Sequence, residues 1–157
     1  MKVNLCCGSK TKKGFFNYDK YVIKDNVIYL DCNKLPLPFE DNSIDEYCIE
    51  QGLEHLNINK RLDIMNELNR TLKMGCKIII GLPTYSPAIY HNTYNHTKGY
   101  FNPICENNVD EKYNNGLFKI NKIWYNKRGL KSIIYYLMDV YRRFRYKSIY
   151  YELEKVN

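Results

Sequence analysis

Three short apolar runs near the start of the chain each end in a glycine or an aspartate. The runs and the residues that end them are Val3–Cys7 with Gly8, Phe15–Tyr18 with Asp19, and Val27–Leu30 with Asp31. Short apolar runs bounded by polar residues are typical of the buried strands of a parallel sheet. The carboxyl ends of such strands form the edge at which open α/β sheets bind ligands. The pattern therefore predicts an α/β fold with a ligand site at that edge.

The later sequence continues the alternation of strands and helices. We expect strands over 44–49, 77–82, 117–125 and 148–156, a helix from a cap at Asn57 or Asn59 to a stop at Gly75, and a second helix over 130–141. The last two strands are expected to be antiparallel, with the second helix between them. Residues 35–39 alternate leucine with proline, which keeps this connector extended. The first crossover, from Gly8 to Asp19, is too short for a full helix and should be a loop.

Length and cysteine usage limit the class of protein. A chain of 157 residues suits one domain with one core, and no apolar run approaches the roughly 20 residues of a membrane span. The six cysteines form no C-x-x-C pair and follow no signal peptide, so they are expected to be buried thiols. His91 and His96 lie five positions apart, on different faces of a helix, so no metal site is predicted. We expect a cytoplasmic protein.

The net charge of +7 is confined to the last quarter of the chain. Residues 118–157 hold 10 of the 24 basic residues and 3 of the 17 acidic ones. The segment around Arg142, Arg143 and Arg145 mixes these cations with aromatic side chains, as many nucleic-acid surfaces do. It lacks any recognition motif, so a solvated basic face is the other interpretation.

Five motifs follow one another between residues 3 and 83. They are Leu5-Cys6-Cys7-Gly8, Gly14-Phe15-Phe16-Asn17-Tyr18-Asp19, Leu35 to Asp45 (LPLPFEDNSID), Leu53-Glu54-His55-Leu56 and Arg70-Thr71-Leu72-Lys73-Met74-Gly75-Cys76. In order and spacing they resemble the class I methyltransferases that use S-adenosylmethionine (SAM), in the compact type 11-like branch. Two positions differ, because Cys6 and Cys76 stand where that branch has glycines.

The resemblance implies a Rossmann-like three-layer sandwich with a mostly parallel seven-stranded sheet and an antiparallel last strand. It implies a single domain over 1–157. Residues 1–83 would form the SAM-binding half, and 84–157 an acceptor loop followed by a C-terminal strand–helix–strand unit. The cofactor would be SAM and the product S-adenosylhomocysteine.

The resemblance also implies a set of site residues. Those expected to bind the cofactor are Leu5, Cys6, Cys7, Gly8, Asp19, Asp31, Cys32, Glu50 and Gln51. Asp19 would accept hydrogen bonds from the ribose hydroxyls, and Asp31 with the Cys32 backbone would bind adenine. Glu50 and Gln51 would meet the methionine end. SAM is cationic at its sulfur and its amine, so an acidic stretch would suit it as a lip, or about half of the stretch would be plain solvated surface. Its residues are Glu40, Asp41, Asp45, Glu46, Glu50 and Glu54.

The acceptor side is less well defined by the sequence. His55 is a candidate general base because imidazole titrates near neutral pH, or it supports the cofactor by packing. The aromatic-rich segment 84–116 would hold the acceptor, with Tyr85, His91, Tyr94 and His96 as candidates. We expect methyl transfer to an oxygen or nitrogen of a small molecule or saccharide. An RNA or protein acceptor docked on the basic C-terminal segment, or a non-catalytic partner subunit altered at Cys6, are the alternatives.

Overall fold

The computed structural model describes residues 1–56, 60–83, 117–127 and 146–156, which form seven strands, one 3-10 turn and one α-helix. Their bounds in chain order are β1 Lys2–Leu5, β2 Phe16–Asp19, β3 Val27–Tyr29, β4 Ile44–Glu50, η1 Leu53–His55, α1 Arg61–Thr71, β5 Leu72–Pro83, β6 Phe118–Lys127 and β7 Tyr146–Lys155. In these ranges no helix is long and apolar enough to cross a membrane.

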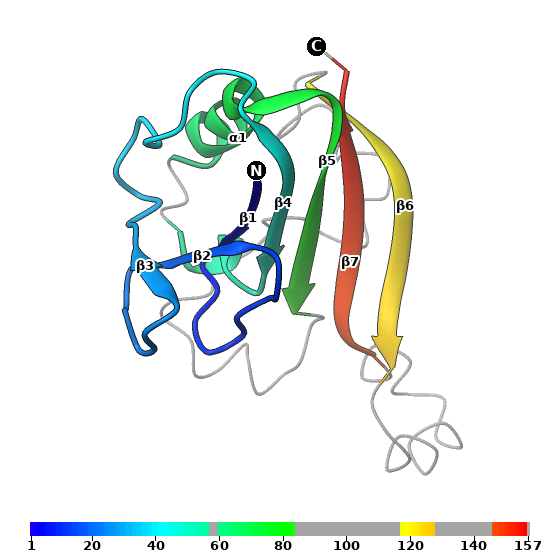
Figure 1. Ribbon diagram of the computed structural model, residues 1–157. Coiled ribbons are helices and arrows are strands. Elements are labelled where there is room, and N and C mark those ends of the chain that lie inside the picture. The colour runs from blue at the N-terminus through cyan, green and yellow to red at the C-terminus, as the bar shows by residue number, and fades with distance from the viewer. Residues whose placement is uncertain (57–59, 84–116, 128–145, 157) are drawn as a thin grey trace, which may run out of the picture.

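All seven strands belong to one sheet, in the order β3-β2-β1-β4-β5-β7-β6 (Figure 1). Neighbouring strands from β3 to β5 are parallel, whereas β7 is antiparallel to both β5 and β6. The expected Rossmann-like sheet with an antiparallel last strand is confirmed. The helix expected over 130–141 falls outside the described residues.

One face of this sheet is apolar and carries the core. Alternate residues of the central strands point to it, and the most buried are Val3, Leu5, Tyr47, Ile49, Ile78 and Ile80. They form one cluster with Ile64, Met65 and Leu68 of α1. The Tyr47 hydroxyl also lies 2.7 Å from Thr71 Oγ1, which joins β4 to the end of the helix.

The opposite face is polar at β1 and β2, where it is organised by the first crossover, which is a loop as predicted. Asn4 on β1 and Asn17 on β2 are both buried, and Asn4 Nδ2 donates to Asn17 Oδ1 over 2.8 Å. Asn4 also donates to the carbonyl of Lys10. Asn17 accepts from the Lys12 N–H and donates to the carbonyls of Lys12 and Phe15. These side chains satisfy backbone groups that a crossover helix would have paired internally.

The predicted limits of the helix were wrong at both ends. Its N-cap is Lys60, with no side-chain cap, rather than Asn57 or Asn59, and it ends at Thr71, four residues before Gly75. The carbonyls at its C-terminus accept hydrogen bonds from the buried ammonium of Lys155, at 2.8 Å from Asn69 O and 2.9 Å from Leu72 O. A cation on β7 thus takes the place of the expected glycine cap. Gly75, at φ +70°, lies instead within the irregular start of β5.

Candidate functional site

The carboxyl ends of β1, β2, β3 and β4 bring the predicted cofactor residues to one edge of the sheet (Figure 1). Cys6–Gly8 follow β1, Asp19 ends β2, Asp31 and Cys32 come just after β3, and Glu50 ends β4. The side chains of Leu5 and Cys7 are both buried, and the Cys7 N–H donates to the carbonyl of Tyr18.

The turn after β1 is built from two left-handed residues, Cys6 at φ 53° and Gly8 at φ 51°. β1 therefore ends at Leu5, two residues earlier than the apolar run indicated. A Cβ on Gly8 would have no protein atom within 4 Å, so the backbone angle, rather than crowding by the protein, favours glycine here. The Gly8 N–H donates to Asp19 Oδ2 over 2.8 Å, which ties this turn to the end of β2.

Asp19 and Asp31 are the two buried carboxylates of this edge. The second oxygen of Asp19 accepts from the Tyr21 N–H at 2.8 Å, and each of its oxygens retains a lone pair for a further donor. Asp31 accepts from the backbone and side chain of Asn33 and lies 3.4 Å from Lys20 Nζ. Burial alone would raise the pKa of the Asp31 carboxyl, but the hydrogen bonds from Asn33 and the charge of Lys20 lower it. Asp31 is therefore an ionised acceptor at neutral pH.

Glu50, at the end of β4, is the third acid of the edge. Lys12 Nζ lies 2.7 Å from Glu50 Oε1, and the Tyr150 hydroxyl donates to Oε2 over 3.5 Å. Burial raises the pKa of the Glu50 carboxyl, but Lys12 and Tyr150 outweigh this effect and the pKa is lowered. The Tyr150 ring stacks on Trp124 with centroids 5.3 Å apart, so an aromatic pair on β7 and β6 adjoins this carboxylate.

Gln51 links three segments beside Glu50. Its backbone is left-handed at φ 56°, and its N–H donates to the carbonyl of Gly81. Its side chain accepts from Lys10 Nζ at 3.2 Å and donates to Ser148 Oγ at 2.9 Å. Sequence reasoning missed the β7 residues, Ser148 and Tyr150, because they come about 100 positions later and only the antiparallel register brings them here.

The acidic residues of the 40–54 stretch do not form one lip, and that prediction was wrong. Asp45 and Glu46 lie at the amino end of β4, the opposite edge from Glu50, because a seven-residue strand separates its two ends. Each is paired, Asp45 with Lys73 and Glu46 with Lys2. Asp41 pairs with Arg70. The acids that do lie at the carboxyl edge are Glu50, Asp19 and Asp31, and two of them are also paired, Glu50 with Lys12 and Asp31 with Lys20.

The acceptor-side candidates are only partly described. His55 ends the 3-10 turn η1, is exposed, and donates its backbone N–H to the carbonyl of Gly52. The other candidates, Tyr85, His91, Tyr94 and His96, lie outside the described residues, as do Arg142, Arg143 and Arg145.

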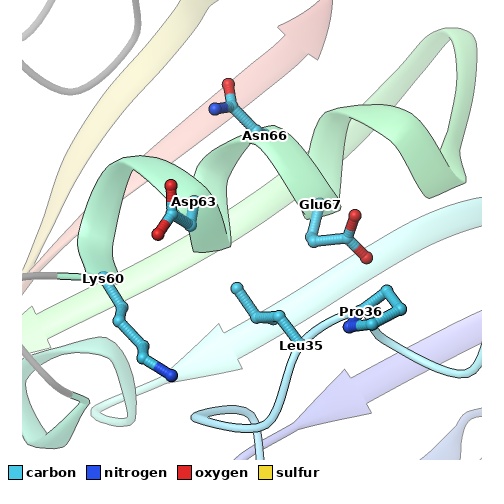
Figure 2. Close-up of a pocket in the computed structure, with 6 residues that line it drawn as sticks. All are labelled: Leu35, Pro36, Lys60, Asp63, Asn66 and Glu67. Atoms are coloured by element: carbon cyan, nitrogen blue, oxygen red, sulfur yellow. The ribbon is translucent and has the colours of Figure 1, made fainter.

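An open pocket of about 400 Å³ lies between α1 and the connector that precedes β4 (Figure 2). Its lining residues are Leu35, Pro36, Lys60, Asp63, Asn66 and Glu67. Lys60 Nζ donates to the carbonyl of Asn33, which fixes one end of the pocket to the segment after β3. None of the predicted cofactor residues lines this pocket, so it is distinct from the carboxyl-edge site.

The comparison with protein families decides the class of this protein. A profile of the ubiE/COQ5 methyltransferase family matches residues 10–133, which is more than three quarters of the chain. The chain belongs to the ubiE/COQ5 methyltransferase family. It is a class I SAM-dependent methyltransferase, and the predicted enzyme class and cofactor are confirmed.

Solved structures agree on the fold of this methyltransferase. A SAM-dependent methyltransferase from Archaeoglobus fulgidus aligns with a TM-score of 0.67 at 16% identity, over 99% of this chain and 85% of that one. A second, from Mesorhizobium loti, gives 0.60 at 12% identity, over 98% and 90%. A chain from the complex of the Haloferax volcanii Trm112 methyltransferase activator with a methyltransferase gives 0.62 at 14% identity, over 99% and 82%. No curated protein matches the chain.

The carboxyl edge also fits SAM chemically. SAM carries a cationic sulfonium and a cationic amine, which favour anionic partners. Its ribose hydroxyls and its adenine amine are hydrogen-bond donors and need oxygen acceptors. Asp19, Asp31 and Glu50 offer carboxylate oxygens at the carboxyl ends of β2, β3 and β4, on either side of the Cys6–Gly8 turn that follows β1.

Proposed function

We propose that this methyltransferase transfers the methyl group of SAM to an oxygen or nitrogen of a small-molecule or saccharide acceptor. The observation that supports the cofactor site most directly is the set of three acids at the carboxyl ends of neighbouring strands, with the left-handed Cys6–Gly8 turn beside them. Asp19 would accept from the ribose hydroxyls, and Asp31 with the Cys32 N–H would bind adenine. Glu50 and Gln51 would hold the methionine end.

The chemical step needs orientation more than catalytic groups. SAM would supply the methyl group, which an acceptor lone pair would displace from sulfur, and the carbon–sulfur electron pair would leave with sulfur as S-adenosylhomocysteine. The acceptor must also lose a proton. His55 is the candidate base because its turn follows Gln51 and Gly52 directly and leaves the residue exposed. The stacked Trp124 and Tyr150 next to Glu50 support an acceptor with a flat or ring-shaped surface.

Calorimetric titration of S-adenosylhomocysteine tests the cofactor site. Asp19→Asn keeps the shape of the side chain but removes its charge, and hydrogen bonds to charged groups contribute about 1.5–3 kcal/mol. We expect micromolar binding to the wild-type chain and a loss of at least about tenfold in the variant. The matched control is Asp25→Asn, which changes an exposed acid on the loop after β2. This variant should bind S-adenosylhomocysteine as tightly as the wild-type chain. A well-folded wild-type chain that binds neither S-adenosylhomocysteine nor SAM would contradict the proposal and favour a non-catalytic partner subunit.

A second candidate is an RNA or protein acceptor docked on the basic C-terminal segment. The confinement of the whole charge excess to residues 118–157 favours it, and one structural neighbour is a methyltransferase in complex with an activator protein. Reversal of Arg142, Arg143 and Arg145 to glutamate should then abolish RNA binding that weakens steeply with salt. RNA binding that is absent, or unchanged by the reversal, leaves the small-molecule proposal as the better one.

A further inference from the structure

Two thiols meet at the proposed cofactor site although they are 26 positions apart in the chain. Cys6 Sγ lies 3.7 Å from Cys32 Sγ, and the two are not joined by a disulfide. Cys6 is half-buried in the turn after β1, whereas Cys32, directly after Asp31, is buried. The contact therefore bridges the segments that follow β1 and β3.

The position of the Cys6 side chain is set by its surroundings. Its left-handed backbone, at φ 53°, fixes the direction of the Cα–Cβ bond. Gly52, after β4, provides the space for it, because a Cβ on residue 52 would lie 2.4 Å from Cys6 Cβ and 3.3 Å from its sulfur. With Gly52 on one side and Cys32 on the other, the Cys6 thiol is held toward its partner in the reduced protein.

We propose that Cys6 and Cys32 are a modification site that accepts a low-molecular-weight disulfide, such as glutathione disulfide, and closes into an internal disulfide. The more accessible Cys6 thiolate attacks the glutathione disulfide, forms a mixed disulfide, and releases one glutathione thiol. Cys32 then attacks the Cys6 sulfur and releases the second glutathione, so two protein thiols are oxidised and one external disulfide is reduced. The two sulfurs must approach by about 1.6 Å to reach the length of an S–S bond.

The bond joins segments with different roles in the proposed cofactor site, so this consequence rests on the proposed function. The Cys6–Gly8 turn would lie along the methionine part of SAM, and Asp31 with Cys32 would bind adenine. A disulfide between these segments draws them together and lowers the affinity for the cofactor. Reduction reopens the site, and cofactor binding follows the thiol–disulfide balance.

The test treats the full reduced chain with glutathione disulfide and measures two quantities. Digestion without reductant followed by mass spectrometry identifies the cross-linked peptides, and calorimetry gives the affinity for S-adenosylhomocysteine before and after oxidation. We expect a peptide pair that links residues 6 and 32, at least a tenfold loss of affinity, and full recovery with dithiothreitol.

Three variants make the result specific. Cys6→Ser and Cys32→Ser should each give no such peptide pair. Cys6→Ser should keep the same affinity after oxidation, whereas Cys32→Ser should retain glutathione on Cys6 as a mixed disulfide, which the mass of the peptide reveals. Cys76→Ser removes a half-buried thiol at the opposite edge of the sheet and should behave like wild type.

The outcomes separate this inference from the proposed function. A Cys6–Cys7 bond, an intermolecular bond, or no bond at all would overturn the inference, whether or not the reduced chain binds S-adenosylhomocysteine. A 6–32 bond that leaves the affinity unchanged would overturn the effect on the cofactor. Failure of the reduced chain to bind S-adenosylhomocysteine would overturn the proposed function and, with it, that effect, while the peptide map still decides whether the disulfide forms.

Discussion

The two faces of the sheet are built from the same strands but follow different physical rules. On the face that carries α1, nearly every position of the central strands is apolar and buried, as Tyr47 and Ile80 are. On the opposite face, β1 and β2 present the buried Asn4 and Asn17, and β5 presents Lys77 paired with Glu152 of β7. One face is held by apolar burial and the other by hydrogen bonds and ion pairs.

The difference between the two faces of the sheet follows from the segments that connect its strands. Parallel sheets are normally covered by crossover helices on both faces and are then apolar on both. Here the links from β1 to β2 and from β2 to β3 lie wholly within the described residues and contain no helix. Loops carry polar backbone groups, and the strand residues beneath them must be polar to satisfy those groups. When a crossover is too short to form a helix, the strand residues beneath it must therefore be polar rather than apolar.

The strongest test of the comparison uses neighbouring isoleucines of β5. Ile80→Ala empties a fully buried position on the apolar face and should lower the free energy of unfolding by about 2–5 kcal/mol. Ile79→Ala, on the polar face and half-buried, should cost about 1 kcal/mol. Urea denaturation measures both, and equal losses would show that the two faces do not differ in this way.

A smaller effect is expected from the hydrogen bonds of the polar face. Asn17→Ala removes the partner of Asn4 and of the Lys12 backbone, and should destabilise the chain by about 1–3 kcal/mol. Asn121→Ala, which removes an exposed asparagine that donates to Glu154, should change stability by no more than about 0.5 kcal/mol. Thermal denaturation followed by circular dichroism compares the two, and a neutral Asn17→Ala would mean that the crossover loop is held by other contacts.

Ion pairs of the polar face should contribute less to the free energy of unfolding than its buried hydrogen bonds do. Lys77 and Glu152 lie 3.3 Å apart and remain partly exposed, so their coupling should be below about 1 kcal/mol. A double-mutant cycle with Lys77→Met and Glu152→Gln measures it, and 1 M salt should reduce it further. A coupling above 2 kcal/mol that resists salt would contradict this ranking.

The smallest effect on stability is expected from Asp45, an exposed carboxylate at the amino end of β4, and it should depend on pH. Hydrogen bonds from Lys73 and from the amino group of Met1 lower the pKa of Asp45 from 3.8 to about 2. Because the folded-state value is the lower one, the contribution is present above pH 3.8 and is lost as the pH falls toward 2. Asp45→Asn should therefore be slightly less stable than wild type at neutral pH and equal to it near pH 2. Denaturation curves at both pH values test this, and a difference that persists in acid would contradict it.

The sequence predicted the elements whose signals are local. The apolar runs that precede Gly8, Asp19 and Asp31 located β1 to β3, and strand polarity then placed these residues at one edge. The spacing between Gly8 and Asp19 was enough to predict a crossover without a helix. The antiparallel pairing of the last two strands was also foreseen.

Features that depend on distant residues were not predictable in this way. The carbonyls at the end of α1 accept hydrogen bonds from Lys155, 84 positions after Thr71, and from the backbone of Asn42 and Ser43, so no signal near Gly75 could reveal this end. The contact of Cys6 with Cys32 depends on the turn angles after β1, which the sequence does not fix. The separation of Asp45 from Glu50, by contrast, is implied by the strand expected over 44–49, which places the two residues at its opposite ends. The roles of the individual site residues, the single domain and the cytoplasmic location stay predictions.

The order of the last strands has a consequence for how the chain folds during synthesis. β6 pairs only with β7 among the described strands, and β7 fills the place between β6 and β5. When β6 leaves the ribosome, β5 therefore still has an open edge and β6 has no strand to pair with. Both edges can pair with other chains until Tyr146–Lys155 is made, and exposed edges of this kind promote aggregation. The final ten-residue strand thus protects the nascent chain as well as completing the sheet.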